Sequence, residues 1–169
     1  MPTGEISKIE ISRIWILVII DVTTKCVLGY HVTLNPEYNS DDVLQTIRNS
    51  LVRWEPKTLT IPGLTGYSDN DGFPSSKIEG SFGAKWQEFT LDNGMANKAD
   101  QVKKFVIDKL HANYCLGPVA NPTRRGSVER FFKRLEEDFF HRLPSTTGSG
   151  PNDVKNKIQL IMLVNMIFK

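Results

Sequence analysis

The sequence predicts one mixed α/β domain, because runs typical of strands alternate along the chain with runs typical of helices. Residues 14–20 form a continuous apolar run rich in β-branched side chains, which is typical of a strand buried on both faces. Residues 39–54 carry apolar side chains at helical spacing behind a cap candidate, Asn39 or Ser40. A chain of 169 residues is long enough for one such domain with a sizeable core.

The N-terminal part is expected to form a β-hairpin behind a short edge strand. Residues 8–12 alternate between apolar and polar side chains, which indicates the edge strand. The sequence VTTK at 22–25 suits a tight connection, and residues 26–34 supply the partner strand of the hairpin. In the helix predicted over 39–54, the buried stripe consists of Val43, Ile47, Leu51 and Trp54.

Residues 55–85 are expected to form a long surface excursion, because three prolines and five glycines punctuate them and apolar periodicity fails. One short strand is expected there, at 58–61. The remaining elements of the domain are a strand at 86–91, an amphipathic helix at 98–110, a short strand within 112–119 and a helix at 127–143. The domain therefore covers residues 1–143, followed by a Ser/Thr/Gly/Pro-rich linker at 144–153 and a terminal apolar helix at 154–169.

Composition and charge favour a soluble globular protein in a reducing compartment. The apolar fraction is 40%, the charged fraction 24% and the net charge +2, so any affinity for nucleic acid must come from a local patch. Cys26 and Cys115 lack metal-type spacing, which favours reduced thiols. The longest apolar runs are far shorter than a membrane-spanning helix, so no membrane partner and a cytoplasmic location are expected.

Two acids are candidates for a metal site. Asp92 closes a predicted strand and precedes Asn-Gly, and Glu129 lies in the first turn of a predicted helix, with 36 residues between the two. Two carboxylates brought together repel one another, and a divalent cation such as Mg²⁺ relieves that repulsion. Each acid also has an ordinary explanation, since Asp-Asn-Gly is a common turn and a helix dipole favours Glu in the first turn.

Five cations surround Glu129, and they are Arg124, Arg125, Arg130, Lys133 and Arg134. Such a cluster on a chain of low net charge suits a phosphate backbone. The alternative is a solvated helix face, because three acids, at positions 136–138, follow immediately.

These motifs resemble the catalytic core of DDE-type integrases and transposases. The resemblance lies in the hairpin WILVIIDVTTKCVLGYHVTL, in FTLDNGMAN, and in LGPVANPTRRGSVERFFKRLEEDFFHRLP, and it covers about residues 12–145. The sequence FHRLPSTTGS is similar to the larger bacterial transposases of the Mu-like type. The resemblance implies a ribonuclease H-like fold, in which a mixed five-stranded sheet carries helices on both faces.

The same resemblance implies a polynucleotidyl transferase in which three acids, Asp-Asp-Glu, hold two Mg²⁺ or Mn²⁺ ions. Asp92 matches the second acid and Glu129 the third, while Arg124, Arg125, Arg130 and Lys133 would hold the DNA backbone. The implied partners are transposon ends, target DNA and further copies in a homo-oligomer. The implied location is the bacterial cytoplasm, in association with the nucleoid.

The first acid of the triad is not matched. The resemblance places it on a strand ahead of the hairpin, near Thr3 or upstream, where MPTGEIS offers only Glu5. Asp21 matches the acid of the later hairpin motif and is predicted to form an Asx-turn, with metal ligation as the alternative. The first strand is thus predicted to be truncated and this fragment to be inactive by itself.

Two other functions fit the same residues. One is a ribonuclease H-like nuclease that cleaves without strand transfer. The other is a DNA-binding or assembly module that keeps the fold without the chemistry. The residue at the first-strand position in the upstream sequence separates the enzyme from the module, because an Asp there supports the enzyme.

Overall fold

The computed structural model describes residues 14–60, 62–63, 65–91, 94–116, 130–135 and, for the backbone, 161–165. The strands are β1 Trp15–Asp21, β2 Val27–Thr33, β3 Glu88–Leu91, β4 Asn113–Leu116 and β5 Ile161–Asn165. The helices are α1 Ser40–Leu51, α2 Pro74–Lys77 and α3 Asp100–Lys104, with a π-helical turn at Phe105–Lys109 and a further helical segment at 130–135.

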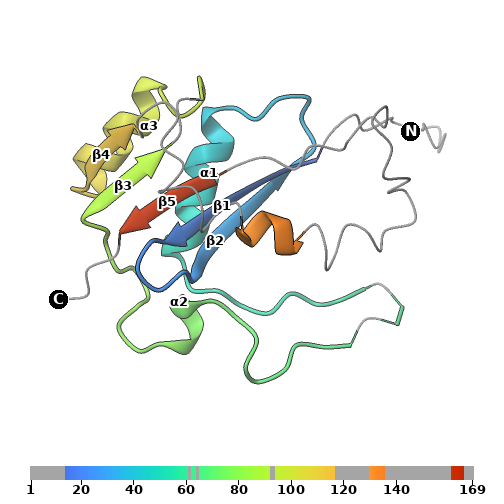
Figure 1. The fold of residues 1–169 in the computed structure, drawn as a ribbon. Coiled ribbons are helices and arrows are strands. Elements are labelled where there is room, and N and C mark those ends of the chain that lie inside the picture. Colours follow the sequence, from blue (N-terminus) through green and yellow to red (C-terminus); the bar gives the residue numbers. More distant parts are fainter. Residues whose placement is uncertain are drawn as a thin grey trace, which may run out of the picture.

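The strands form one mixed sheet in the order β2-β1-β5-β3-β4 (Figure 1). β1 pairs with β2 in the antiparallel sense and with β5 in the parallel sense. β3 pairs with β4 in the parallel sense and with β5 in the antiparallel sense. The last of the described strands in the sequence, β5, is therefore the central one.

The predicted hairpin is confirmed. Trp15 pairs with Thr33 at one end of the ladder and Ile20 with Val27 at the other. A register shift between Ile19 and Ile20 adds one residue to β2, and such a bulge strengthens the local twist of the strands.

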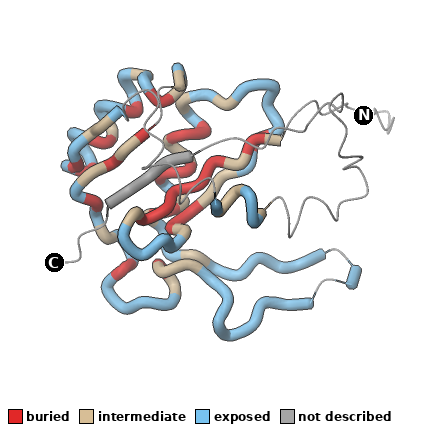
Figure 2. Tube along the Cα trace, in the orientation of Figure 1, coloured by how far each residue is buried: buried red, intermediate tan, exposed pale blue. Residues whose placement is uncertain are grey.

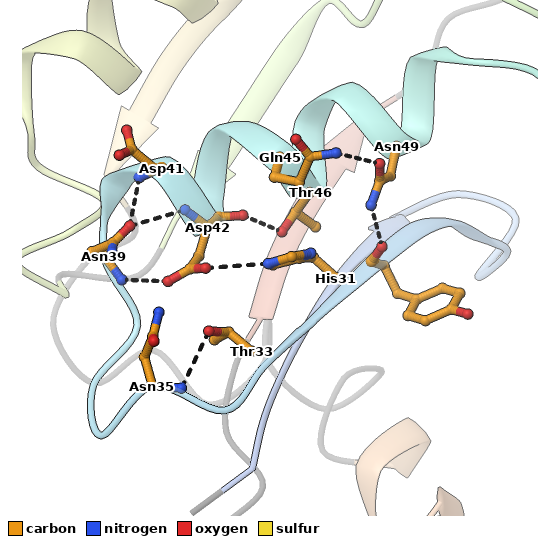
Figure 3. Close-up of polar contacts among 10 residues, drawn as sticks. His31, Thr33, Asn35, Asn39, Asp41, Asp42, Gln45, Thr46 and Asn49 are labelled. Atoms are coloured by element: carbon orange, nitrogen blue, oxygen red, sulfur yellow. Dashed lines mark hydrogen bonds and ion pairs between the residues drawn. The ribbon is translucent and has the colours of Figure 1, made fainter. Parts of the chain in front are cut away.

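The predicted start of α1 is also confirmed, and it is a capping box (Figure 3). The Asn39 side-chain oxygen accepts hydrogen bonds from the backbone N–H of Asp41 at 2.8 Å and of Asp42 at 3.1 Å. The Asp42 carboxylate accepts one from the Asn39 N–H at 2.9 Å. These reciprocal bonds satisfy donors that an uncapped helix would leave open.

The expected end of this helix at residue 54 is wrong. α1 stops at Leu51, because Val52 has an extended backbone with ψ of 153°. Trp54 therefore lies beyond the helix instead of in its buried stripe, and its ring packs edge-on against Tyr67 and Phe73. The backbone N–H of Trp54 donates to the Ser75 hydroxyl at 3.1 Å, which connects α2 to the segment that follows α1.

The excursion over 55–85 is largely exposed, as Figure 2 shows. Its described part, including residues 58–60, contains no strand, so the strand expected at 58–61 is not found there. The regular element is instead the short helix α2, which begins with Pro74. Proline at the first helical position is favoured because its fixed φ already suits the helix.

The helix predicted over 98–110 is confirmed in part, because α3 widens into a π-helical turn. The Leu110 N–H donates to the Phe105 carbonyl, five residues back, at 3.2 Å. Val102, Val106 and Leu110 are buried as expected, whereas Lys109, expected along the same side, is exposed. Lys109 is the last residue of this π-helical turn, and the buried apolar positions on either side of it are unchanged from the prediction.

The sheet carries apolar packing on both faces. Figure 1 shows α1 behind the sheet and the orange helical segment 130–135 in front. On the α1 face the core contains Leu17, Ile19, Val43, Ile47, Phe89, Leu91, Val102 and Val106, all at most 2% exposed. On the opposite face Phe131 and Phe132 pack against Val18 and Ile20.

β4, expected within 112–119, lies at the edge of the sheet beside β3. The Tyr114 hydroxyl donates to the Asn97 carbonyl at 2.6 Å and so ties β4 to the segment before α3. Burial raises the pKa of the Tyr114 phenol, because desolvation disfavours the phenolate. The group therefore remains a donor at neutral pH.

The expected terminal helix is wrong for residues 161–165, which form β5. A short apolar run does not distinguish a buried strand from a buried helix by periodicity. The decisive factor is non-local, because a strand at this place completes backbone hydrogen bonds of β1 and β3. Several predictions lie outside the described residues. They are the strand at 8–12, the linker at 144–153, the helix at 127–143 apart from residues 130–135, and the terminal helix at 154–169 apart from residues 161–165.

Candidate functional site

The candidate site residues divide into two groups. Asp21, Arg130 and Lys133 are among the described residues, whereas Asp92, Glu129, Arg124 and Arg125 lie outside them. Asp92 follows Leu91, the last residue of β3, and Glu129 precedes Arg130, the first residue of the described helical segment. The described elements therefore fix the sheet and helix positions that flank both acids.

Asp21 holds the turn between β1 and β2. Its carboxylate oxygen Oδ2 accepts hydrogen bonds from the Thr24 N–H at 2.6 Å and from the Thr24 hydroxyl at 2.5 Å. Its backbone N–H donates to the Cys26 carbonyl, and its carbonyl accepts from the Lys25 N–H, both at 2.9 Å. Lys25 adopts a left-handed conformation with φ of 64°, which closes the turn. The Asp21 carboxylate therefore accepts a hydrogen bond from a turn amide, as predicted, although the donor lies three residues on instead of the two of an Asx-turn.

The register of the sheet separates Asp21 from the end of β3. Through β5, Asp21 is level with Phe89, because both pair with Val164. Leu91 is level with Ile19, since both pair with Met162. With usual strand spacings and rises, Asp21 and Leu91 lie about 12 Å apart. β1 and β3 run in opposite directions, so β3 ends away from the turn that Asp21 holds.

Asp21 is 1% exposed, so its carboxylate has little access to water and needs hydrogen-bond donors from the protein. Asp21→Ala is expected to lower the free energy of unfolding by about 2 kcal/mol, because the Thr24 N–H and hydroxyl lose a charged acceptor. Thr24→Val should cost about 1 kcal/mol, since it removes only the hydroxyl. Urea unfolding followed by circular dichroism measures both losses.

The double variant serves as the control. If the two side chains act through one another, the double variant should lose less than the sum of the single losses. Strict additivity would contradict the assignment of Asp21 to the turn.

A second buried acid is also engaged in structure. Asp42, which caps α1, lies with Oδ1 3.1 Å from His31 Nε2 on β2 (Figure 3). Its other oxygen accepts the Asn39 N–H. This link between sheet and helix was not predicted from the sequence, although Asn39 and Asp42 stand at capping-box spacing. Within the ranges that the structure describes, no three His, Cys, Asp or Glu side chains gather as a metal site would require.

The helical segment 130–135 turns its charges away from the sheet. Phe131 and Phe132 contact the sheet face, with their rings 5.4 Å apart in an edge-to-face arrangement. Arg130, Lys133 and Arg134 are exposed. Part of the predicted basic cluster therefore forms a solvent-facing surface, termed the cationic helix face, fixed to the sheet by aromatic packing.

Two comparisons with known proteins bear on this arrangement. The family model described as the TnsB C-terminal domain matches residues 4–145. A transposase for transposon Tn552 from Staphylococcus aureus is 23% identical over 137 residues, which make up 81% of this chain and 24% of that protein. The chain thus spans about a quarter of the length of this relative.

The chain is therefore a transposase-related domain. The chain belongs to the TnsB C-terminal domain family. Among the helices that the structure describes, none has the length and apolarity needed to cross a membrane.

Proposed function

We propose that this chain is part of the catalytic core of a DDE-type DNA transposase with a ribonuclease H-like fold, related to the Mu-like bacterial enzymes. The whole protein would cleave a phosphodiester at the end of a mobile element and join the freed 3′-hydroxyl to target DNA. The proposed partners are transposon ends, target DNA and further copies of the protein. The family membership and the transposase relative support this proposal.

One observation carries the proposal beyond family membership. Phe131 and Phe132 pack against Val18 and Ile20, the two residues of β1 that flank Ile19. Ile19 is the residue of β1 that is level with Leu91. The helix that follows Glu129 therefore contacts the sheet at the same level at which β3 ends before Asp92. This common level supports a shared role for the two acids.

The chemistry of the two acids fits a divalent cation. Carboxylate oxygens are the donors that Mg²⁺ and Mn²⁺ prefer, so Asp92 and Glu129 would hold the metal. Asp21 is not proposed as their partner, because its carboxylate already accepts two hydrogen bonds from Thr24. Bound metal would supply activation of the attacking oxygen and stabilisation of the leaving one. The third carboxylate is proposed to come from outside this chain.

The cationic helix face would bind the DNA backbone. Arg130 and Lys133 are exposed on it, and Arg124 and Arg125 precede it in sequence. Lysine and arginine neutralise phosphates and fix the register of a protein on DNA without reading its bases. These side chains would hold the scissile strand while Asp92 and Glu129 carry the metal-dependent step.

The proposal is tested by lengthening the protein. The 169-residue chain and a version carrying about thirty residues of the natural upstream sequence are incubated with Mg²⁺ and a duplex from the element's own end. The length is an estimate for one strand and its connection. Strand joining is expected only for the longer protein. The joined product is resolved from the cleaved one on a denaturing gel.

Each other outcome has a definite meaning. Cleavage without joining in the longer protein would identify a nuclease instead of a transposase. DNA binding without either product would identify a DNA-binding or assembly module. Joining by the 169-residue chain itself would contradict the proposal that a third carboxylate is missing from it.

A further inference from the structure

The excursion over 55–85 is attached to the edge of the sheet by a row of aromatic rings. Tyr30 on the edge strand β2 has its ring 5.8 Å from that of Phe73, and the Phe73 ring is 5.9 Å from that of Trp54. The backbone at Gly72 passes so close to Trp54 that an added Cβ would stand 3.0 Å from Cζ3 of its ring. Tilted and edge-to-face ring pairs at these separations are favourable. The rings therefore hold the excursion beside β2, although most of its residues are exposed.

Lys57 of the excursion lies over the same tyrosine. Its Nζ is 5.9 Å from the centroid of the Tyr30 ring, within the range of a cation–π contact. The ring attracts the ammonium group and limits the freedom of a long side chain, so less conformational entropy is lost when the lysine binds an anion. Lys57 is exposed, and among the described residues no carboxylate pairs with it. Its charge is therefore available to a partner.

Tyr30 and the helical segment 130–135 pack on one apolar cluster. Tyr30 pairs with Val18 across the antiparallel ladder, so their side chains are neighbours on the same face of the sheet. Phe131 and Phe132 belong to the same cluster as Val18 and Tyr30. In Figure 1 the first part of the excursion runs below the orange helical segment. Cations from two segments that are far apart in the sequence thus flank a single cluster.

We propose that Lys57 and the cationic helix face form one DNA-binding surface, in which Lys57 contacts a backbone phosphate of the same duplex. The inference rests on the proposed function, which assigns DNA to the cationic helix face, and it adds a contact from a different part of the chain. The exposed charges of Lys57, Arg130, Lys133 and Arg134 complement the phosphates along a duplex.

The contact is confined to one part of the excursion. Residues 55–85 contain four acids and three lysines, so the excursion as a whole is not basic. Lys77 donates a hydrogen bond to the Asp69 carbonyl at 2.6 Å, which occupies its ammonium group within the excursion. Lys57 is instead the lysine that contacts Tyr30 and so lies next to the apolar cluster. It is therefore the residue of the excursion assigned to DNA.

A second point of contact affects the orientation of the duplex. DNA held at the helical segment alone can still turn about that point. A phosphate contact at Lys57 limits this rotation, because phosphate contacts fix the register and orientation of a protein on DNA without reading its bases. Lys57 is thus a positioning residue for DNA and has no part in the metal-dependent step.

The salt dependence of DNA binding tests this assignment in the 169-residue chain. A fluorescein-labelled duplex of arbitrary sequence is titrated without metal, and binding is followed by fluorescence anisotropy at NaCl concentrations from about 50 to 200 mM. Lys57→Gln is expected to reduce the slope of log K against log[NaCl] by about 0.9, the value for one phosphate contact. Over the decade from about 1 M to about 0.1 M NaCl, this slope corresponds to about eightfold weaker binding.

Three further variants serve as controls. Lys104→Gln makes the same change of net charge on α3, which packs on the α1 face of the sheet through Val102, and it should leave the slope unchanged. Lys57→Arg keeps a cation that also stacks on aromatic rings, so it should retain both the slope and the affinity. Arg130→Gln, on the cationic helix face, should reduce the slope as much as Lys57→Gln does.

Tyr30→Leu tests whether the ring positions the lysine. This variant keeps Lys57 and removes the ring under its ammonium group, so binding to the duplex should weaken by about twofold. In a chain that already carries Lys57→Gln, the same substitution should leave binding unchanged, because the two residues act through one another. The Lys57 variants decide the proposal by themselves if Tyr30→Leu does not fold.

The outcomes separate this inference from the proposed function. An unchanged slope for Lys57→Gln beside a reduced slope for Arg130→Gln would overturn the inference alone, since Lys57 would then only hold the excursion. Equal reductions for Lys57→Gln and Lys104→Gln would also overturn it, because they would reflect net charge. If the unaltered chain shows no salt-dependent binding, the inference fails together with the DNA-binding role of the cationic helix face. Strand joining by the upstream-extended protein with Mg²⁺ tests the catalytic proposal separately.

Discussion

Asp92→Asn and Glu129→Gln are each expected to lower the rate of Mg²⁺-dependent strand joining by about a thousandfold in the upstream-extended protein. Each substitution keeps the size of the side chain and removes the negative charge that would hold a divalent cation. A loss of about 4 kcal/mol of transition-state stabilisation corresponds to this factor. The measurement is the initial rate of joined product from a labelled duplex of the element's end.

Asp21→Asn in the same protein is the matched control for these two variants. Asp21 is also a strand-end acid, but its carboxylate binds the Thr24 donors in the β1–β2 turn. The amide keeps an acceptor oxygen, so the joining rate should stay within about threefold while stability falls by about 1 kcal/mol. A loss for Asp21→Asn as large as that for Asp92→Asn would contradict the assignment of the acids.

Gly29→Ala should lower the free energy of unfolding by about 3 kcal/mol. Gly29 lies on β2 where the strand passes under α1, and an added Cβ would stand 2.6 Å from Ser50 Cα and N. Both atoms belong to the helix backbone, so the contact is relieved only if α1 moves away from the sheet. Overpacking typically costs about 1–3 kcal/mol, and the upper end applies here because two close-packed backbones have little room to move apart. Urea unfolding measures the change.

Gly66→Ala provides the comparison for this substitution. An added Cβ at Gly66 meets nothing within 4 Å, and the residue lies in the exposed excursion. Its free energy of unfolding should change by less than about 0.5 kcal/mol. Similar losses for the two alanine variants would show that the contact between β2 and α1 is not tightly packed.

The elements that could be predicted from the sequence are those that local chemistry specifies. The hairpin follows from two apolar, β-branched runs joined by a short polar turn, and Asn39 and Asp42 mark the start of α1 by their spacing. Asp21 was expected in the turn because Asx residues bond to nearby backbone donors. Each of these signals lies within a few residues of the feature that it predicts.

The features that the sequence analysis missed depend on distant parts of the chain. The π-helical turn at Phe105–Lys109 was not predicted, because no local pattern marks it. Trp54 leaves the helical stripe because it packs with Tyr67 and Phe73. β5 is a strand because β1 and β3 require a partner, which a short apolar run does not reveal.

The candidate site could be predicted only as far as residue types and spacing allow. The sequence pairs Asp92 with Glu129 and places cations nearby, which are local observations. It does not indicate that Asp21 is level with Phe89 and not with Leu91, because this follows only from the pairing of β1 and β3 with β5. The turn role of Asp21 was predicted from its neighbours in sequence. The register adds that Asp21 is not level with the end of β3.

The position of β5 also affects how the chain folds during synthesis. β1 and β3 leave the ribosome well before residues 161–165, and at usual translation rates the delay after β3 is several seconds. During that interval the two halves of the sheet lack the strand that joins them. The newly made chain would then expose strand edges with unpaired backbone N–H and C=O groups. This favours binding by chaperones and makes the yield of folded protein sensitive to expression rate and temperature.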